Sequence, residues 1–245
     1  MSGSSSEGAS STASALPPLE YHNLTLNAKK RRFYTPYEVS EHNCASDCWV
    51  SFLNKVYNLT PLIALNKTSV LIEPIVANAG RDISHWFDAT TQDVKTWIDP
   101  IINERAFYTP MKRFLHVPAP PYEAKSKTQE VIPVVPWWQD SKYMIGYLSR
   151  KTRFIRIINT LTQDDHQLEV CSEETLREIL DRYLVFNAHA ASYTWKRLGE
   201  VLDMEKTLSE NGIEDEDGEF EELGIRDDYY IPAIHLMYND DLTIG

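Results

Sequence analysis

The residues best able to do chemistry lie between positions 47 and 88, where histidine is scarce. His85 is the only histidine between His42 and His116, and its imidazole could ligate a metal or carry a proton. Tyr57 offers a phenol in the apolar run that opens this stretch. The alternative for His85 is an ordinary position at the end of a helix. The sequence therefore makes His85 the first candidate ligand of a cofactor and Tyr57 the second.

Cysteine offers little further metal chemistry in this chain. Cys44 and Cys48 are four positions apart, but no two further Cys or His ligands stand near them in sequence. Structural zinc needs four such ligands, so we expect no metal site. The three cysteines are an odd number, which is typical of a reducing compartment.

Sequence signatures of common enzyme classes are missing. The chain contains no Gly-x-Gly-x-x-Gly, no phosphate loop, no Gly-x-Ser-x-Gly and no His-Glu-x-x-His. Its carboxylates cluster in predicted loops rather than at apolar positions, so paired acid and base catalysis has no support. We therefore expect no catalytic residue, no small-molecule substrate and a non-enzymatic protein.

Charge and hydropathy narrow the class of partner. A net charge of -12 argues against the phosphate backbone of nucleic acid and against an anionic membrane. The chain has no run of eighteen apolar residues, and Met1 to Leu16 lacks the basic start and apolar core of a secretory signal. The basic residues 29–32 are expected to be a solvated flank, with an acidic partner or an import signal as the alternatives. These features predict an intracellular protein that binds other proteins.

The first folded domain is predicted over residues 33–117, after a flexible tail at 1–32 that is rich in Ser, Gly, Ala and Thr. Thr35 should cap a short helix that starts at Pro36. A hairpin of 49–53 with 55–59, turning at Asn54, should precede a short helix and a passage between helices at 79–87. We expect a helix over 90–98, stopped before Pro100, and a second hairpin of 105–108 with 113–117.

A connector is predicted over residues 118–150, because five prolines interrupt it before residue 137. Its part from 119 to 134 should run as an extended polyproline-like chain. Trp137 and Trp138 follow, and adjacent tryptophans seldom stay in water. Their rings could dock on one of the two domains, or they could anchor a partner protein.

The second domain is predicted over residues 151–245. Strands are expected at 154–158, 166–170, 193–196 and 233–238, with a short helical turn at 208–213. Ser172 should cap a helix with Glu173 and Glu174 in its first turn and an apolar face at positions 176, 179, 180, 183 and 184. This order is that of a β-grasp, and the half resembles ubiquitin-like domains. It departs from them in an acidic insertion at 214–219, expected to be a solvated loop, and in a tail at 240–245 without paired terminal glycines. These departures favour a binding module over a conjugated one.

The first half resembles the cytochrome b5 haem-binding fold. Residues 47–50 with 55–60 match its tryptophan strand and following turn, and 79–82 with 86–87 continue the match, which covers 33–98. The resemblance implies haem b held by two imidazoles. Residues 66–69 read Asn-Lys-Thr-Ser, however, where cytochrome b5 has His-Pro-Gly-Gly, and no histidine lies between Phe87 and Trp97. We therefore expect an α+β chain whose b5-like domain has no cofactor, with haem b on His85 as the alternative.

The two halves in this order, with residues 157–162 and 189–196, resemble a family of proteins of motile cilia. That family is associated with the radial spokes of the axoneme and with haem-linked redox signalling. The resemblance implies a structural or adaptor protein of the cytoplasm and the ciliary axoneme, with radial spoke proteins as partners. The alternatives are a haem-binding redox sensor that regulates ciliary beating and a module that recruits ubiquitin-pathway proteins.

Overall fold

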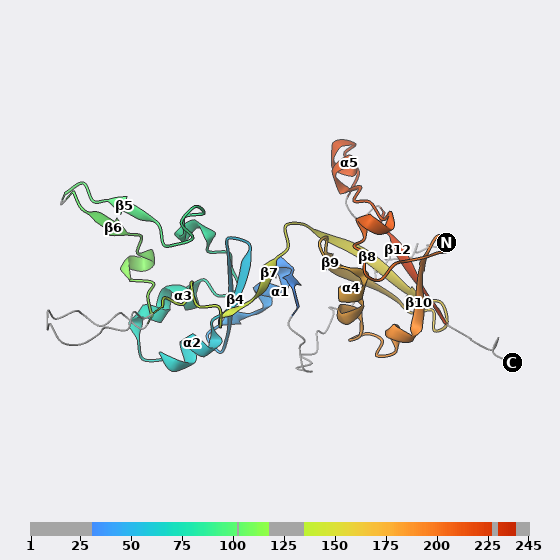
Figure 1. The fold of residues 1–245 in the computed structure, drawn as a ribbon, viewed down its shortest axis with the longest axis horizontal. Coiled ribbons are helices and arrows are strands. Elements are labelled where there is room, and N and C mark those ends of the chain that lie inside the picture. Colours follow the sequence, from blue (N-terminus) through green and yellow to red (C-terminus); the bar gives the residue numbers. More distant parts are fainter. Residues whose placement is uncertain (1–30, 102, 118–134, 227–229, 239–245) are drawn as a thin grey trace, which may run out of the picture.

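The computed structural model describes residues 31–101, 103–117, 135–226 and 230–238, which form two domains that meet at helix α1 (Pro36–Glu41) and strand β7 (Met144–Leu148) (Figure 1). Each domain combines one main sheet with short helices, as expected for an α+β chain. Among the helices described, none has the length and apolarity needed to cross a bilayer.

The main sheet of the first domain is built on the predicted hairpin. Its five strands lie in the order β1-β7-β4-β3-β2, and β3 pairs antiparallel with β4. The turn between them is made by Leu53 and Asn54, both with positive φ, as a tight hairpin turn requires. The hairpin and its turn at Asn54 are thus confirmed. The strands are β1 (Phe33–Tyr34), β2 (Asn43–Cys44), β3 (Asp47–Phe52) and β4 (Lys55–Asn58).

Short helices cover this sheet. Thr35 caps α1 with its side chain, as predicted, and Glu38 completes a capping box by accepting the Thr35 N–H. The other helical segments of the domain are α2 (Thr60–Leu65), η1 (Val70–Ile72), α3 (Glu73–Ala77), η2 (Ser84–Trp86) and η3 (Pro110–Lys112). Apolar residues of α2, η1, α3 and η2 join β3 and β4 in one core.

The predicted helix at 90–98 and the predicted hairpin at 105–117 are both wrong. The Asp88 carboxylate accepts the N–H groups of Thr90 and Thr91 and holds them in a turn. Strand β5 (Thr96–Ile98) follows and pairs with β6 (Arg105–Phe107), so the hairpin forms one segment earlier than expected.

The domain also extends beyond residue 117, into the stretch expected to be a connector. Strand β7 pairs antiparallel with β4 and parallel with β1, which places it inside the main sheet. The expected boundary at 117 is therefore corrected to the end of β7. The predictions of a flexible tail over 1–32, apart from residues 31 and 32, of an extended chain over 119–134 and of a tail at 240–245 lie outside the described residues.

The second domain has a five-stranded sheet in the order β11-β10-β12-β8-β9. Strands β8 and β9 form the predicted hairpin, and β12 lies parallel to β8 and antiparallel to β10. The apolar face of α4 shares one core with these strands, as expected. The elements are β8 (Thr152–Asn159), β9 (Asp165–Cys171), α4 (Leu176–Tyr183), η4 (Ala190–Ser192), β10 (Tyr193–Arg197), β11 (Glu200–Val201), η5 (Ser209–Asn211), α5 (Asp217–Glu222) and β12 (Ala233–Tyr238).

Two details of this domain differ from the prediction. The cap of α4 is Thr175, not Ser172, and Glu178 completes its capping box. Glu174 therefore lies before the helix rather than in its first turn. The acidic segment that we expected to be a solvated loop includes the short helix α5.

Candidate functional site

Five aromatic rings fill the centre of the first domain. Phe52 is stacked between Tyr57 and Phe87, with ring centroids 4.4 and 4.3 Å apart. The Trp137 ring meets all three edge-on at 5.9 to 6.3 Å, and the Trp138 ring meets Trp137 edge-on at 5.5 Å. Both tryptophans are buried, so of the two roles considered for them the structure places them as core residues.

Each tryptophan of this cluster also makes a hydrogen bond through its indole. Trp137 donates to the carbonyl of Leu115 at 2.8 Å, and Trp138 donates to the Asp93 carboxylate at 2.9 Å. The polar edge of each ring is therefore satisfied inside the protein. These bonds tie the segment before β7 to the chain on both sides of the β5–β6 hairpin, since Asp93 precedes β5 and Leu115 follows β6.

The two candidate ligands occupy different surroundings. Tyr57 is buried within the aromatic cluster, and its hydroxyl donates to the carbonyl of Trp138 at 3.3 Å. Burial raises the pKa of this phenol, which disfavours the phenolate that would bind iron. His85 lies in η2 with an exposed side chain, its ring 5.7 Å from the ring of Trp86.

Asn66, at one expected ligand position, and His42, the nearest histidine before His85 in sequence, are both used in local structure. Asn66 ends α2, and its side-chain amide donates to the Leu62 carbonyl at 2.9 Å. The ring of His42 is stacked on Trp49 at 3.5 Å, with Nδ1 2.6 Å from the Asp47 carboxylate. A b5-type haem needs two imidazoles that face each other across an apolar slot. The donor set of the described residues does not fit that arrangement.

The two spaced cysteines do not form a ligand pair either. Cys48 is buried in the core, and burial raises the pKa of its thiol to about 12. Cys44 is exposed on the neighbouring strand. Zinc binds thiolate rather than thiol, so Cys48 is a poor ligand. Among the described residues no group of three or more His, Cys, Asp and Glu side chains could hold a metal ion.

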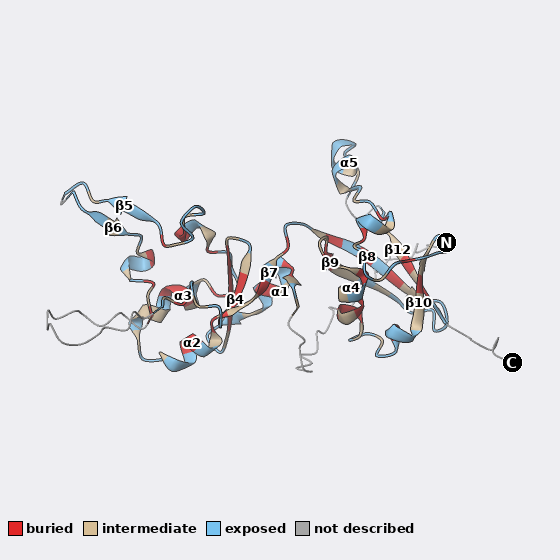
Figure 2. Ribbon diagram, in the orientation of Figure 1, coloured by how far each residue is buried: buried red, intermediate tan, exposed pale blue. Residues whose placement is uncertain are grey.

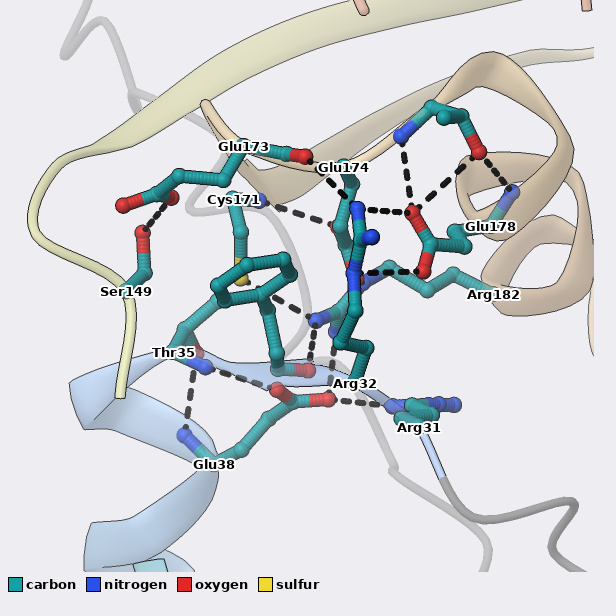
Figure 3. A network of polar contacts seen from close by, with 12 residues as sticks. Arg31, Arg32, Thr35, Glu38, Ser149, Cys171, Glu173, Glu174, Glu178 and Arg182 are labelled. Carbon is teal, nitrogen blue, oxygen red and sulfur yellow. Dashed lines mark hydrogen bonds and ion pairs between the residues drawn. The ribbon is translucent and has the colours of Figure 1, made fainter. Parts of the chain in front are cut away.

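A second buried cluster, the junction network, joins the two domains through Arg182 of α4 (Figure 3). The Arg182 Nε lies 2.8 Å from both carboxylate oxygens of Glu174, and Nη1 is paired with Glu38 of α1. Its Nη2 donates to the carbonyl of Phe33 at 3.2 Å and to the Cys171 sulfur at 3.3 Å. One buried guanidinium therefore contacts β1, α1, β9 and the segment before α4.

The capping boxes of two helices meet at this junction. Glu38, from the box of α1, pairs with Arg182 and also with Arg31. Glu178, from the box of α4, pairs in return with Arg32, which precedes α1. The start of each helix thus supplies a carboxylate to an arginine, and Figure 3 shows Arg32 and Arg182 lying between Glu38 and Glu178.

The connection after β7 is held in the same network. The Ser149 hydroxyl donates to the Glu173 carboxylate at 2.7 Å, and the Arg150 N–H donates to its other oxygen at 2.9 Å. The Ser149 N–H donates to the Tyr34 carbonyl at 2.9 Å. The chain therefore enters the second domain through a fixed turn.

Burial and opposite charge compete in the junction network. Burial raises the pKa of Glu174, and the bond to Arg182 works against that shift. Burial alone would lower the pKa of Arg182, but Glu38 and Glu174 outweigh it and raise the pKa. Arg182 is therefore charged at every physiological pH, and removing it would leave the buried Glu174 carboxylate without a charged partner.

Sequence reasoning missed this network because it placed Glu173 and Glu174 in the first turn of a helix and gave them no buried basic partner. Two signals were available. Thr35 and Glu38, and likewise Thr175 and Glu178, have the Thr-x-x-Glu spacing of a capping box. Arg182 stands among the apolar positions of α4, where a charge needs a buried partner. The basic flank also differs from the prediction, since Arg31 and Arg32 contact the junction.

Comparison with known proteins agrees with the extended first domain. Residues 35–149 match the family model described as "Cytochrome b5-like Heme/Steroid binding domain". Cytochrome b5 domain-containing protein 1 of Xenopus tropicalis is 59% identical over 218 residues, which cover 89% of this chain and 99% of that protein. The human protein of the same name is 49% identical over 227 residues, which cover 93% and 95%. The chain belongs to the cytochrome b5 domain-containing protein 1 family.

The extent of these matches agrees with the geometry. The b5-like match ends at residue 149, directly after β7, and therefore includes Trp137 and Trp138. The full-length relatives also match through the second domain. A prokaryotic relative of cytochrome b5, cytochrome b558 of Ectothiorhodospira vacuolata, aligns with 25% of the chain at 23% identity and a TM-score of 0.21.

Proposed function

We propose that this member of the cytochrome b5 domain-containing protein 1 family is a non-enzymatic adaptor of the motile-cilium axoneme, at the radial spokes. The observation that supports an adaptor is the junction network, in which the buried guanidinium of Arg182 bonds to α1, β1 and the segment before α4. Such a network holds the two domains in one orientation. A fixed pair of domains can present two docking surfaces at a set spacing.

We also propose that the second domain is a ubiquitin-like β-grasp. The sheet order β9-β8-β12-β10-β11, with the terminal strand parallel to the first, supports this assignment. So does the packing of α4 across the sheet. This domain would serve as a binding surface for axonemal proteins.

Fractionation of ciliated cells tests the adaptor role. Tagged full-length chain should stay with axonemes after detergent extraction, and Arg182→Met should release most of it because the domains lose their fixed orientation. Asp165→Asn, which alters an exposed ion pair, is the matched control and should stay bound. Recovery of the unaltered chain only in the soluble fraction would contradict the proposal.

A haem-binding redox sensor is the second candidate, since the matched family model describes a haem or steroid site. His85 is the exposed imidazole through which haem b would bind. Titration of the purified chain with hemin tests this. A Soret band that shifts on titration and is lost in His85→Ala would favour the sensor, while an unchanged spectrum would exclude this ligand.

A further inference from the structure

The β5–β6 hairpin projects from the first domain on the side away from the second domain (Figure 1). It pairs Thr96 with Phe107 and Ile98 with Arg105, and the two strands form a sheet of their own. The ribbon coloured by burial shows it almost entirely exposed (Figure 2). We call the described residues of 95–114 the arm.

Large apolar side chains gather on the arm. Trp97 is 50% exposed, Ile98 66% and Ile101 90%. Further exposed apolar side chains on it are Phe107, Tyr108, Met111 and Phe114. An isolated two-stranded hairpin is marginal in water, and a patch of this kind on a soluble protein is typical of a binding surface. Covering these side chains would release about 25 cal/mol for each Å² of apolar surface removed from water.

The base of the arm is held by the core. The Lys95 N–H donates to the carbonyl of buried Trp86 at 2.9 Å, and the Tyr108 N–H donates to the Lys95 carbonyl at 2.7 Å. The turn at the tip is also closed, since the Asp99 N–H donates to the Glu104 carbonyl at 2.9 Å. A preformed arm loses little conformational freedom on binding.

The charge of the arm differs from that of the whole chain. Residues 95–114 carry four basic and two acidic side chains, in a chain with a net charge of -12. Arg113 is paired with Glu73, at 2.7 Å. Lys95, Arg105 and Lys112 are exposed and form no ion pair with another described residue. Their charges are therefore available to an acidic partner.

We infer that the arm inserts into an apolar groove of a partner protein whose rim is acidic. A second copy of this chain fits less well, because a two-fold contact would place one basic arm against another. A membrane also fits less well, because Asp99 and Glu104 flank the apolar tip. The inference deepens the proposed adaptor role by giving one of its docking surfaces.

A random-peptide library displayed on phage, selected on the purified full chain, tests this directly. Enriched peptides should combine apolar residues with Asp or Glu, and a synthetic copy should bind the chain. Its affinity should fall at least about tenfold in Trp97→Ala/Phe107→Ala and in Lys112→Glu. Leu223→Ala, which removes an exposed apolar side chain of the second domain, is the matched control and should leave binding unchanged.

Lys112→Glu keeps every apolar residue of the arm, so it tests the inference even if the double variant folds poorly. Peptides without acidic residues, or equal binding by all variants, would overturn the inference. So would arm-dependent dimers in light scattering, or arm-dependent binding to phosphatidylcholine vesicles containing phosphatidylserine. Because this test uses purified protein, peptide binding can fail while the chain is still retained on axonemes. Equally, peptide binding can succeed while the chain is not retained.

Discussion

The two buried clusters of this protein are built from opposite chemistry. In the first domain, five stacked and edge-on rings fill the centre with apolar surface. At the junction, Arg182 is surrounded by two carboxylates, the Phe33 carbonyl and the Cys171 sulfur. Aromatic packing depends on side chains of matching volume and shape, whereas a buried charge depends on specific charged or hydrogen-bonding partners. A b5-like core can therefore keep its fold without iron ligands, while the junction ties specific residues of one domain to the other.

The largest expected effect comes from emptying the aromatic cluster. Trp137→Ala should lower the free energy of unfolding by ~3–5 kcal/mol, because it removes the ring that touches Phe52, Tyr57 and Phe87 and leaves a cavity. Urea denaturation of the full chain measures this. Leu65→Ala, at an exposed position of the same domain, should change stability by less than ~0.5 kcal/mol. Equal effects of the two substitutions would contradict a core role for Trp137.

Breaking the junction network should lower the free energy of unfolding somewhat less than emptying the aromatic cluster does. Arg182→Met leaves Glu174 buried without its partner and should destabilise by about 3 kcal/mol, the lower end of the range for a broken buried pair. Glu38 keeps Arg31, which limits the loss. The double variant Arg182→Met/Glu174→Gln should recover at least ~1 kcal/mol, measured as a double-mutant cycle. Strict additivity would mean that the two side chains do not interact.

A smaller effect is expected at the capping boxes that border the junction. Thr175→Ala should cost ~1 kcal/mol, because the Glu178 N–H loses the hydroxyl that caps α4. Thr175→Ser keeps that hydroxyl and should recover most of the loss. Thermal or urea unfolding measures both. A larger loss in Thr175→Ser than in Thr175→Ala would contradict the capping role.

The smallest effect is expected for an ion pair outside both clusters. The hydrogen bond from Arg156 lowers the pKa of Asp165, and both side chains are exposed, so Asp165→Asn should cost less than ~1 kcal/mol. Because the pKa of Asp165 is lower in the folded protein than in the unfolded chain, the ion pair stabilises the fold at pH values above the unfolded-state pKa of ~3.9. This stabilisation is lost as the pH falls through the folded-state pKa. The difference in free energy of unfolding between the unaltered chain and Asp165→Asn should therefore vanish in acid. A difference that grows in acid would contradict this sign.

Much of the fold could be predicted from local patterns. The hairpin turn at Asn54, the cap at Thr35 and the strand at 233–238 follow from alternation, turn chemistry and capping, which act over a few residues. The strand β7 could not be found this way. It begins eight residues after Pro136, in a stretch whose prolines indicated a connector, and its place depends on pairing with β4.

The candidate site shows the same division. The expectation that the b5 ligand histidines are replaced comes from the chain itself, at Asn66 and after Phe87. The burial of Trp137 is not visible, because the ring reaches residues up to 85 positions earlier, at Phe52. Nor is the pairing of Arg182 with Glu38, 144 positions apart.

The sequence by itself therefore determined the α+β class and most hairpins and helices. Only the tertiary structure decided where the first domain ends, what fills its centre and how the two domains are joined. The physical reason is the separation along the chain of the groups that interact. Caps, turns and alternation depend on neighbours along the chain, whereas burial of a ring or a charge depends on groups that folding brings together from distant positions.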